Sequence, residues 1–182
     1  MRVIAGTARR INLVAPAGST TRPTSDRAKE ALFSILAADL QDAFFLDLFC
    51  GSGAMGIEAL SRGALHATFV DESKAAMDAL AHNLQTTKLQ DKARFMRNKA
   101  KNAIHTFNNP PYNNFDIIFM DPPYDGHWIS DTLAALANTC ILNEGGQIIV
   151  EMETKLPLPD AAGFALTDQR EYGRTRFLFY NH

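Results

Sequence analysis

Residues 44–56 read FFLDLFCGSGAMG: a short apolar run, a loop with glycines at positions 51 and 53, and the start of a helix. Glycine allows a tight turn and lets a ligand approach the backbone, and this order of strand, loop and helix is typical of a nucleotide-binding unit. The next apolar run ends at Asp71, and 71 − 51 = 20, the spacing expected of a carboxylate that binds ribose hydroxyls. The stretch therefore predicts an α/β fold that binds an adenosine-containing cofactor.

Apolar strand-like runs and helix-forming segments alternate along the rest of the chain, as in repeated βα units. We expect strands at 44–49, 67–70, 94–96, 117–120 and 147–151, helices at 24–38, 54–62, 73–87, 100–107 and 127–139, and a final strand pair at 164–171 and 175–180. Such units form a mainly parallel sheet with helices on both faces, and the final pair adds an antiparallel edge. Residues 1–15 have the pattern of a short β-hairpin. We interpret 1–182 as a single domain, with a basic hairpin and helix extension over 1–40 and a catalytic core over 41–182.

The composition is that of a globular protein, with 182 residues of which 46% are hydrophobic and 21% charged. No apolar run reaches the roughly 18 residues of a membrane span, and the first residues lack a signal-peptide pattern. The two cysteines, Cys50 and Cys140, have no metal-ligand spacing. We therefore expect a cytoplasmic monomer with free thiols, no membrane contact and no metal.

Charge is unevenly distributed, although the net charge is only −2. Residues 1–30 carry six basic and two acidic side chains, a balance of 6 − 2 = +4, so the remainder carries −6. This distribution favours a polyanion contact at the N-terminus. A second basic cluster lies within residues 88–101, and by charge alone each cluster is as well explained by a solvated surface.

The acidic residue before the glycine loop distinguishes between two adenosine cofactors. Asp47 would face the pyrophosphate of a nicotinamide dinucleotide unfavourably, whereas it can organise the ammonium end of a methionine. We therefore predict S-adenosyl-L-methionine as the cofactor. The alternative is an ordinary βα turn with a surface acid at position 71.

Residues 116–124 read DIIFMDPPY, so an apolar run delivers Asp-Pro-Pro-Tyr to its carboxyl end. The prolines stiffen the loop, Asp121 and the carbonyl of Pro122 can accept N–H groups, and Tyr124 offers an aromatic face to a base. The motif suits a planar ring that carries an exocyclic amine. Asp121, Pro122 and Tyr124 are therefore the predicted catalytic residues.

A similar tetrapeptide, Asn109-Pro110-Pro111-Tyr112, stands before the same apolar run instead of after it. In open α/β sheets, ligands bind at the carboxyl ends of the strands. We therefore interpret residues 109–112 as a turn at the opposite edge of the sheet.

A third segment, RPTSDRAKEALF at 22–33, is by itself a capped helix start with clustered charges. Together with RVIAG at 2–6, Arg9-Arg10, the run GSGAMGIEALSRGA at 51–64 and the Asp-Pro-Pro-Tyr site, it resembles the RsmD family over nearly the whole chain. Members of that family are bacterial methyltransferases that act on a guanine N2 of 16S ribosomal RNA. The resemblance implies a Rossmann-like class I S-adenosylmethionine-dependent methyltransferase, with a seven-stranded sheet that ends in an antiparallel hairpin.

The resemblance also implies partners and site residues. The partner is 16S rRNA within the small ribosomal subunit or an assembly intermediate, contacted in part by the N-terminal hairpin. The residues expected to bind the cofactor are Thr24, Asp47, Phe49, Gly51, Gly53, Asp71, Glu72, Asn98, Lys99, Ala100 and Asp121, and those expected to contact RNA are Arg2, Arg9, Arg10, Arg22 and Arg27.

One position departs from the family pattern. Related enzymes often carry Asp or Asn where this chain has Lys99, and a lysine cannot accept a hydrogen bond from the adenine amino group. Either Asn98 substitutes, or backbone groups near Lys99 and Ala100 bind the adenine.

Three other functions remain open from the residues. A DNA methyltransferase acting on adenine N6 or cytosine N4 uses the same tetrapeptide, although this chain has little room for a target-recognition segment. A protein-glutamine methyltransferase would present an amide to a similar loop. A non-catalytic RNA-binding factor would retain only the fold, but the intact Asp47, Gly51, Gly53, Asp71 and Asp121 argue against it.

Overall fold

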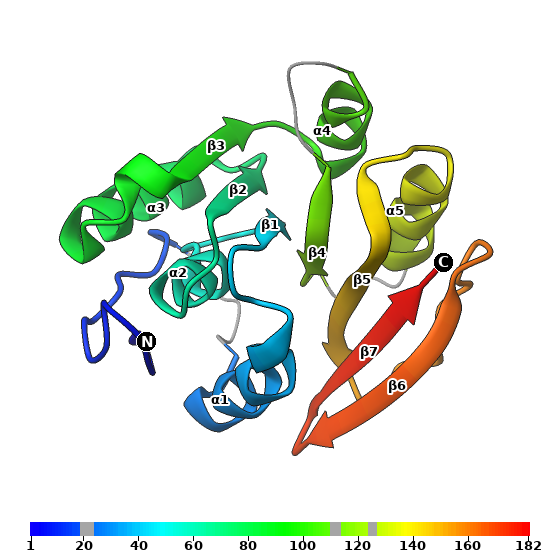
Figure 1. Ribbon diagram of the computed structural model, residues 1–182, viewed down its shortest axis with the longest axis horizontal. Helices are drawn as coiled ribbons and strands as arrows, with labels where there is room; N and C mark the ends of the chain where they lie inside the picture. The colour runs from blue at the N-terminus through cyan, green and yellow to red at the C-terminus, as the bar shows by residue number, and fades with distance from the viewer. Residues whose placement is uncertain (19–23, 110–113, 124–126) are drawn as a thin grey trace.

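A seven-stranded sheet in the order β3-β2-β1-β4-β5-β7-β6 crosses the molecule (Figure 1). The computed structural model describes residues 1–18, 24–109, 114–123 and 127–182. The strands are β1 (Phe44–Leu48), β2 (His66–Asp71), β3 (Ala93–Arg97), β4 (Phe115–Met120), β5 (Leu142–Glu153), β6 (Ala165–Tyr172) and β7 (Thr175–Asn181). The first five strands in this order, β3, β2, β1, β4 and β5, are parallel to their neighbours. Strand β7 lies between β5 and β6 and is antiparallel to both. The predicted fold class, a mainly parallel sheet with a C-terminal antiparallel pair, is confirmed.

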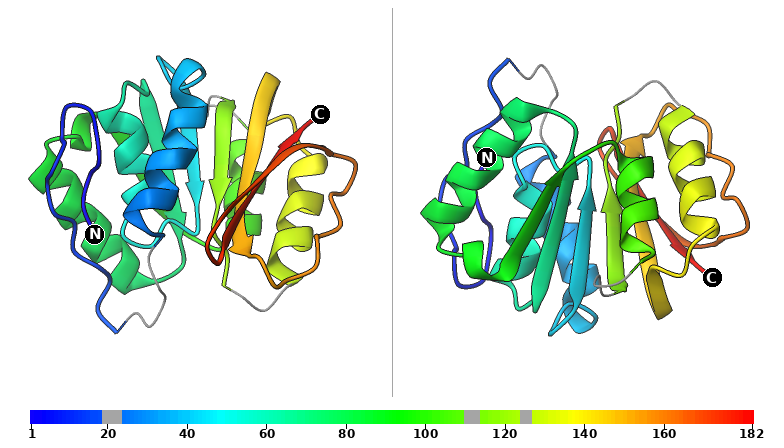
Figure 2. Two further views of the ribbon diagram at one scale, coloured as in Figure 1. Left: turned by 90° about the horizontal axis from the view of Figure 1, so that it is seen from below. Right: turned by 90° about the horizontal axis from the view of Figure 1, so that it is seen from above.

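Helices cover both faces of this sheet (Figure 2). They are α1 (Asp26–Ile35), α2 (Ala54–Ser61), α3 (Lys74–Thr87), α4 (Ala100–Phe107) and α5 (His127–Ala137), with short 3₁₀ turns at Leu36–Ala38 and Gln90–Lys92. Successive residues of β4 supply two cores, because Ile117 and Phe119 face α1, α2 and α3 while Ile118 and Met120 face α4 and α5. Burial on both faces explains why this strand is a continuous apolar run. Within the described ranges, no helix is long and apolar enough to cross a membrane.

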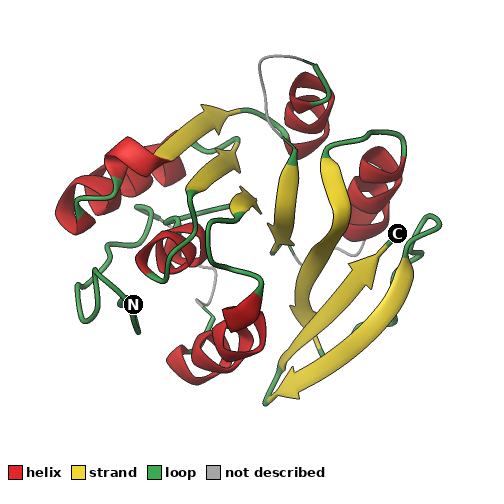
Figure 3. Cartoon of the chain, in the orientation of Figure 1, coloured by secondary structure: helices red, strands yellow, loops and turns green. Residues whose placement is uncertain are grey.

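The N-terminal segment, residues 1–18, differs from the predicted hairpin. Figure 3 draws it as loop, and its only ladder contact is an isolated antiparallel bridge between Arg2 and Asn12. Three backbone hydrogen bonds join the two arms, including one from the Val3 N–H to the Ile11 carbonyl at 2.9 Å. The predicted hairpin is therefore present in a reduced form, in which the two arms run antiparallel side by side but neither arm forms a full strand.

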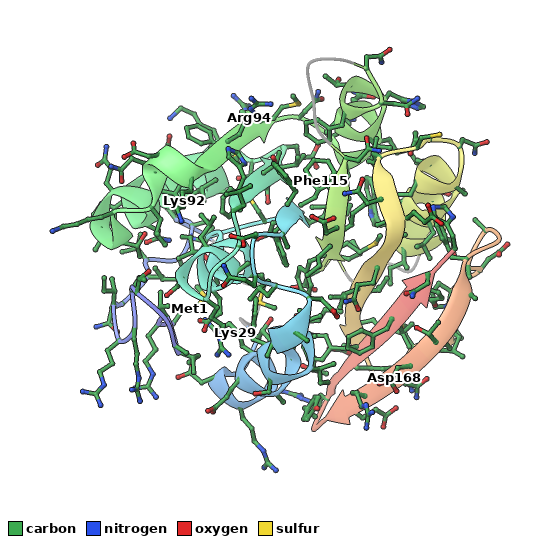
Figure 4. All side chains as sticks on the ribbon, viewed as in Figure 1. Met1, Lys29, Lys92, Arg94, Phe115 and Asp168 are labelled. Carbon is green, nitrogen blue, oxygen red and sulfur yellow. The ribbon has the colours of Figure 1, made fainter. Side chains whose placement is uncertain are left out.

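The reason is that α2 takes the hydrogen bonds that a strand ladder would use. The Glu58 carboxylate, fully buried on α2, accepts the N–H groups of Ile4 and Ala5 at 2.8 and 3.0 Å. The same carboxylate pairs with Arg62 at 2.7 Å and with the buried Lys29 ammonium at 3.3 Å. Burial lowers the pKa of Lys29, while its contact with Glu58 raises it. Lys29 and Met1, labelled in Figure 4, lie in the region where α1 and α2 meet the N-terminal segment.

Strand β5 is longer than the predicted range of 147–151. It begins at Leu142. The register of its pairing with β4 shifts between Phe115 and Ile117, so β5 contains a bulge at this point. Gly145 adopts a positive φ of 75° in this bulge. The sequence Asn143-Glu144-Gly145-Gly146 has the composition of a turn, so the first part of the strand could not be recognised from propensity.

Candidate active site

A cavity of about 410 Å³ lies where the strand order reverses, between β1 and β4. Ligands of open α/β sheets bind at this point, outside the carboxyl ends of the strands. The predicted site residues that line the cavity are Thr24, Asp47, Phe49, Gly51, Asp71, Glu72, Asn98, Lys99, Ala100, Asp121 and Pro122. Tyr124 and Arg22 lie outside the described residues. Met1 and residues 15–18 also line the cavity, so the N-terminal segment contributes to its wall.

The two glycines of the loop after β1 have different surroundings. Gly51 has a φ of 53°, and a Cβ added there would meet no atom within 4 Å, so this backbone is open to a ligand. Gly53 has a φ of 78° and caps the start of α2, where an added Cβ would overlap the side chain of Leu80. The structure therefore does not bring Gly53 to the cavity, and its lack of a side chain serves packing against α3 instead.

Asp71 holds the glycine loop in place. One carboxylate oxygen accepts the N–H of Gly51 at 2.9 Å, and the other accepts the N–H of Ser73 at 2.9 Å, just before α3. The neighbouring Glu72 carboxylate is exposed in the cavity wall and makes no hydrogen bond with any residue in the described ranges. Glu72 is thus the freer of the two predicted acids for binding ribose hydroxyls.

Asp47 is a buried carboxyl group at the end of β1, only 1% exposed. Burial raises its pKa to about 7, the hydrogen bond from the Gly56 N–H lowers it, and the nearby Asp121 and Asp71 raise it further. The Gly56 N–H donates to one Asp47 oxygen at 2.9 Å, which leaves the other oxygen available in the cavity. A ligand cation placed here would favour the ionised form.

The start of α4 closes the other end of the cavity. The side-chain oxygen of Asn98 accepts the Lys99 N–H at 2.9 Å, so it is already engaged. Ala100 is the first residue of α4, and an N–H at that position has no acceptor within its helix. Of the two alternatives for reading an adenine, this arrangement favours the backbone of Ala100 over the Asn98 side chain.

Three carboxyl groups meet at the carboxyl ends of β1, β4 and β5. In the parallel register of β4 and β5, Met120 pairs with Val150, so the residues that follow them, Asp121 and Glu151, are neighbours. Asp47 lies on β1, the strand on the other side of β4. Burial raises the pKa of Asp121 to about 7, a suitable value for a group that accepts hydrogen bonds and protons at neutral pH. Sequence analysis missed Glu151, although an acidic residue inside the apolar run IIVEM was a recognisable signal.

An aromatic pair forms one wall beside Asp121. The rings of Phe49 and Trp128 meet edge to face at 6.4 Å and 74°, and both line the cavity. Phe49 has a positive φ of 62°, unusual for a residue with a side chain, which turns the chain sharply after β1. This wall offers aromatic contacts to a base, in addition to the predicted Tyr124.

Cys50 lines the same cavity but is not a nucleophile. Burial and the nearby Asp47 and Asp71 raise the pKa of its thiol well above the usual value. The protonated thiol is unreactive. Among the residues with described positions, no cluster of three or more His, Cys, Asp and Glu side chains could hold a metal ion.

Of the predicted RNA-binding arginines, the four with described positions do not line the cavity. Arg2 pairs with Asp26 at 2.9 Å, whereas Arg9, Arg10 and Arg27 are exposed and form no ion pair within the described part of the chain. The turn that carries Arg9 and Arg10 lies against the C-terminal end of α2, because the Ala8 N–H donates to the Ser61 hydroxyl at 2.9 Å. The cavity is at the opposite, N-terminal end of the same helix.

Asn109, the first residue of the similar tetrapeptide, does not line the cavity. Asn109 follows α4, and its side chain donates to the His105 carbonyl at 3.0 Å. Residues 110–112 fall outside the described ranges. Because β4 begins at Phe115 and Asp121 follows its end, the two tetrapeptides belong to opposite ends of one strand.

The whole chain is similar to proteins whose names describe methyltransferases. The family model described as conserved hypothetical protein 95 matches residues 1–181. The Bacillus subtilis (strain 168) protein named "Putative rRNA methyltransferase YlbH" is 38% identical over 181 residues, which cover 99% of this chain and 98% of that protein. The "Ribosomal RNA small subunit methyltransferase D" of Escherichia coli (strain K12) is 34% identical over 181 residues, with coverage of 99% and 89%. A solved structure, "Putative methyltransferase yhhF from Escherichia coli", matches with a TM-score of 0.84 at 35% identity, covering 99% of this chain and 96% of that one.

Proposed function

The chain belongs to the RsmD family, the family described as conserved hypothetical protein 95, and on this premise we propose that it transfers a methyl group from S-adenosyl-L-methionine to the exocyclic N2 amine of a guanine in 16S rRNA. The observation that carries the proposal is the position of Asp121 and Pro122. They line a cavity at the strand-order reversal, together with the buried Asp47 and with Glu72, the exposed acid that we assign to the ribose hydroxyls. A nucleobase amine and a methionine-derived cation both fit such a site.

The residues present fit the cofactor along its length. The free oxygen of Asp47 suits the ammonium of the methionine part, Gly51 gives room for close approach, and the Glu72 carboxylate suits the ribose hydroxyls. The N–H of Ala100 suits a ring nitrogen of the adenine. When bound, the cofactor supplies an electrophilic methyl group, so the protein has to position and desolvate the reactants.

The loop after β4 activates the target amine. The nitrogen lone pair of guanine N2 is delocalised into the ring, which makes it a weak nucleophile. Acceptors at Asp121 and the Pro122 carbonyl draw the N–H groups out of the ring plane and free the lone pair. The bound cofactor would supply the methyl group to this nitrogen, and the proton that the amine loses would pass to Asp121 or to water. Phe49 and Trp128 hold the base that has turned out of its stack.

The exposed arginines serve the RNA at a distance from the reaction. The side chains of Arg9, Arg10 and Arg27 are exposed to water. Their charges are therefore available to phosphates of the RNA backbone. Because α2 is buried and the Arg9-Arg10 turn lies at its far end from the cavity, the RNA contact extends from the cavity over the N-terminal segment that covers this helix. Related proteins named as small-subunit rRNA methyltransferases support 16S rRNA as the partner.

Transfer of label from radioactive S-adenosylmethionine tests the proposal. The acceptors are deproteinised 16S rRNA, small subunits, an assembly intermediate, DNA and total protein, and the labelled product is digested and separated by nucleoside chromatography. The proposal predicts N2-methylguanosine from the small-subunit RNA. Label in N6-methyladenine, N4-methylcytosine or methylglutamine would identify one of the alternative methyltransferases, and absence of transfer would indicate a non-catalytic binding protein.

A further inference from the structure

Glu151 is a buried acid that neither the proposed reaction nor the sequence motifs explain. It lies on β5 with 5% of its surface exposed, and its neighbour in the antiparallel register on β7 is the apolar Phe177. The charged groups that act on it are the carboxyls of Asp121 and Asp47, and both have the same sign as its own charge. Burial and these neighbours raise the pKa of Glu151 well above its ordinary value, while the Thr24 hydrogen bond lowers it.

The hydrogen bonding between Thr24 and Glu151 depends on whether the Glu151 carboxyl group carries a proton. The Thr24 hydroxyl oxygen lies 2.9 Å from one Glu151 oxygen and 2.7 Å from the other. A hydroxyl has one proton, so with an ionised carboxylate it makes a single three-centre hydrogen bond that the two oxygens share. A protonated carboxyl satisfies both contacts, because its own O–H donates to the hydroxyl oxygen while the hydroxyl donates to the carbonyl oxygen.

Thr24 connects this acid to the rest of the site. It lines the cavity and stands directly before Ser25, whose side chain caps α1 by accepting the Ala28 N–H at 3.1 Å. Asp121, which lines the same cavity, follows β4 in the register next to Glu151. Glu151 therefore touches the start of α1 on one side and adjoins the reacting loop on the other.

We propose that Glu151 is a positioning residue of the active site: it stays protonated and, through its paired contacts with Thr24, holds the start of α1 against the loop that carries Asp121. The proposal rests on the proposed function for its catalytic consequence, but not for the protonation itself. A neutral Glu151 leaves Asp121 free to carry the single negative charge that faces the substrate amine. An ionised Glu151 shares one hydroxyl proton with Thr24 in place of two hydrogen bonds and places a second charge beside Asp121, so the activity falls when Glu151 loses its proton.

The protonation is tested without any substrate. Protein labelled with ¹³C at the glutamate carboxyl carbon is titrated by NMR, and the Glu151 signal is identified by its absence from Glu151→Gln. We expect this signal to keep its protonated position at pH 7, where exposed glutamates have ionised. A Glu151 signal that titrates near 4.5 with the surface glutamates would overturn the proposal, whatever the protein methylates.

The positioning role is tested by the pH dependence of methyl transfer to small subunits. Glu151→Ala should lower the rate at least tenfold, and Glu151→Gln should recover most of that loss, because a neutral amide can both donate to and accept from Thr24. The Gln variant should also keep its rate at alkaline pH, where the wild-type rate falls. Glu153→Gln, on the same strand, is the matched control and should leave the profile unchanged.

Two outcomes would overturn the positioning role. One is a Gln variant as slow as the Ala variant, and the other is an alkaline decline that is identical in the Gln variant and the wild type. If Glu151→Ala does not fold, Thr24→Val takes its place and should show the same loss. A lack of methyl transfer by the wild-type protein, with the NMR result as expected, would contradict the proposed function and leave the protonated Glu151 established.

Discussion

The carboxyl edge of the sheet and the N-terminal segment use charge in opposite ways. At the sheet edge, Asp47 and Glu151 are buried, and Asp121 shares their enclosed surroundings, so the pKa of each is raised. In the N-terminal segment, the side chains of Arg9 and Arg10 stay in water and the backbone is held by α2. The difference shows that reactivity at neutral pH needs burial, whereas recognition of a polyanion needs charges that remain exposed.

The largest expected effect is on the buried side of this comparison. Asp121→Asn keeps the shape but removes the charge and weakens the acceptor for the amine, so kcat for methyl transfer should fall by roughly 10²–10⁴-fold. Thermal unfolding should show that the variant is folded. Asn109→Ala is the matched control from the similar tetrapeptide and should retain full activity. Activity that survives in Asp121→Asn and disappears in Asn109→Ala would reverse the assignment of the two tetrapeptides.

The second effect concerns how the N-terminal segment is held. Glu58→Gln leaves the buried Lys29 without its ionic partner and weakens the pairing with Arg62, which should cost about 3–5 kcal/mol in the free energy of unfolding. Urea unfolding monitored by tryptophan fluorescence measures this loss. Asp78→Asn, which breaks the exposed pair with Lys74, should change the stability by less than about 1 kcal/mol. Equal effects of the two substitutions would show that Glu58 does not hold the segment.

The third effect is a pH dependence of stability. The pKa of Asp47 rises from 3.8 to about 7 on folding, so the unfolded chain loses this proton first and the protein becomes less stable as the pH rises between these values. Asp47→Asn cannot ionise and still accepts the Gly56 N–H. Its free energy of unfolding should match the wild type near pH 3.8 and exceed it by on the order of 4 kcal/mol above pH 7. Parallel stability curves across this range would contradict the raised pKa.

The smallest effect lies on the exposed side. Changing Arg9 to Gln and Arg10 to Asn, a residue that tolerates the positive φ of 71° at position 10, should raise KM for small subunits by roughly tenfold and change kcat less. The slope of log binding constant against log salt should decrease by about 2, one for each lost phosphate contact. Arg170→Gln on β6, at the distant edge of the sheet, is the control. An unchanged salt slope in the double variant would remove the N-terminal turn from the RNA-binding surface.

Much of the fold could be predicted because local sequence and packing agree. The strand, glycine loop and helix over residues 44–62 have an apolar run, residues suited to positive φ and a helix start in one stretch. Ser25 and Ser73 likewise mark the helix starts that the structure shows. The residues around the cavity follow from this agreement, since the carboxyl ends of neighbouring parallel strands share one edge.

What could not be predicted depends on contacts between distant residues. The N-terminal arms do not form strands because Glu58 and Ser61 take their N–H groups, which no local pattern reveals. Asp71 also accepts the N–H of Gly51, and this contact depends on the shape of the loop. Glu151 meets Thr24 across 127 positions of sequence, so its partner is visible only in the folded chain.

The most direct measurement of the central claim is the N2-methylguanosine content of small-subunit RNA by mass spectrometry, in cells that lack this protein and are complemented with variants. We predict that the content per 16S rRNA falls when the protein is absent, returns with the wild type and Asn109→Ala, and does not return with Asp121→Asn. An unchanged content in cells that lack the protein, or full recovery with Asp121→Asn, would contradict the assignment of Asp121 to methylation of a guanine N2.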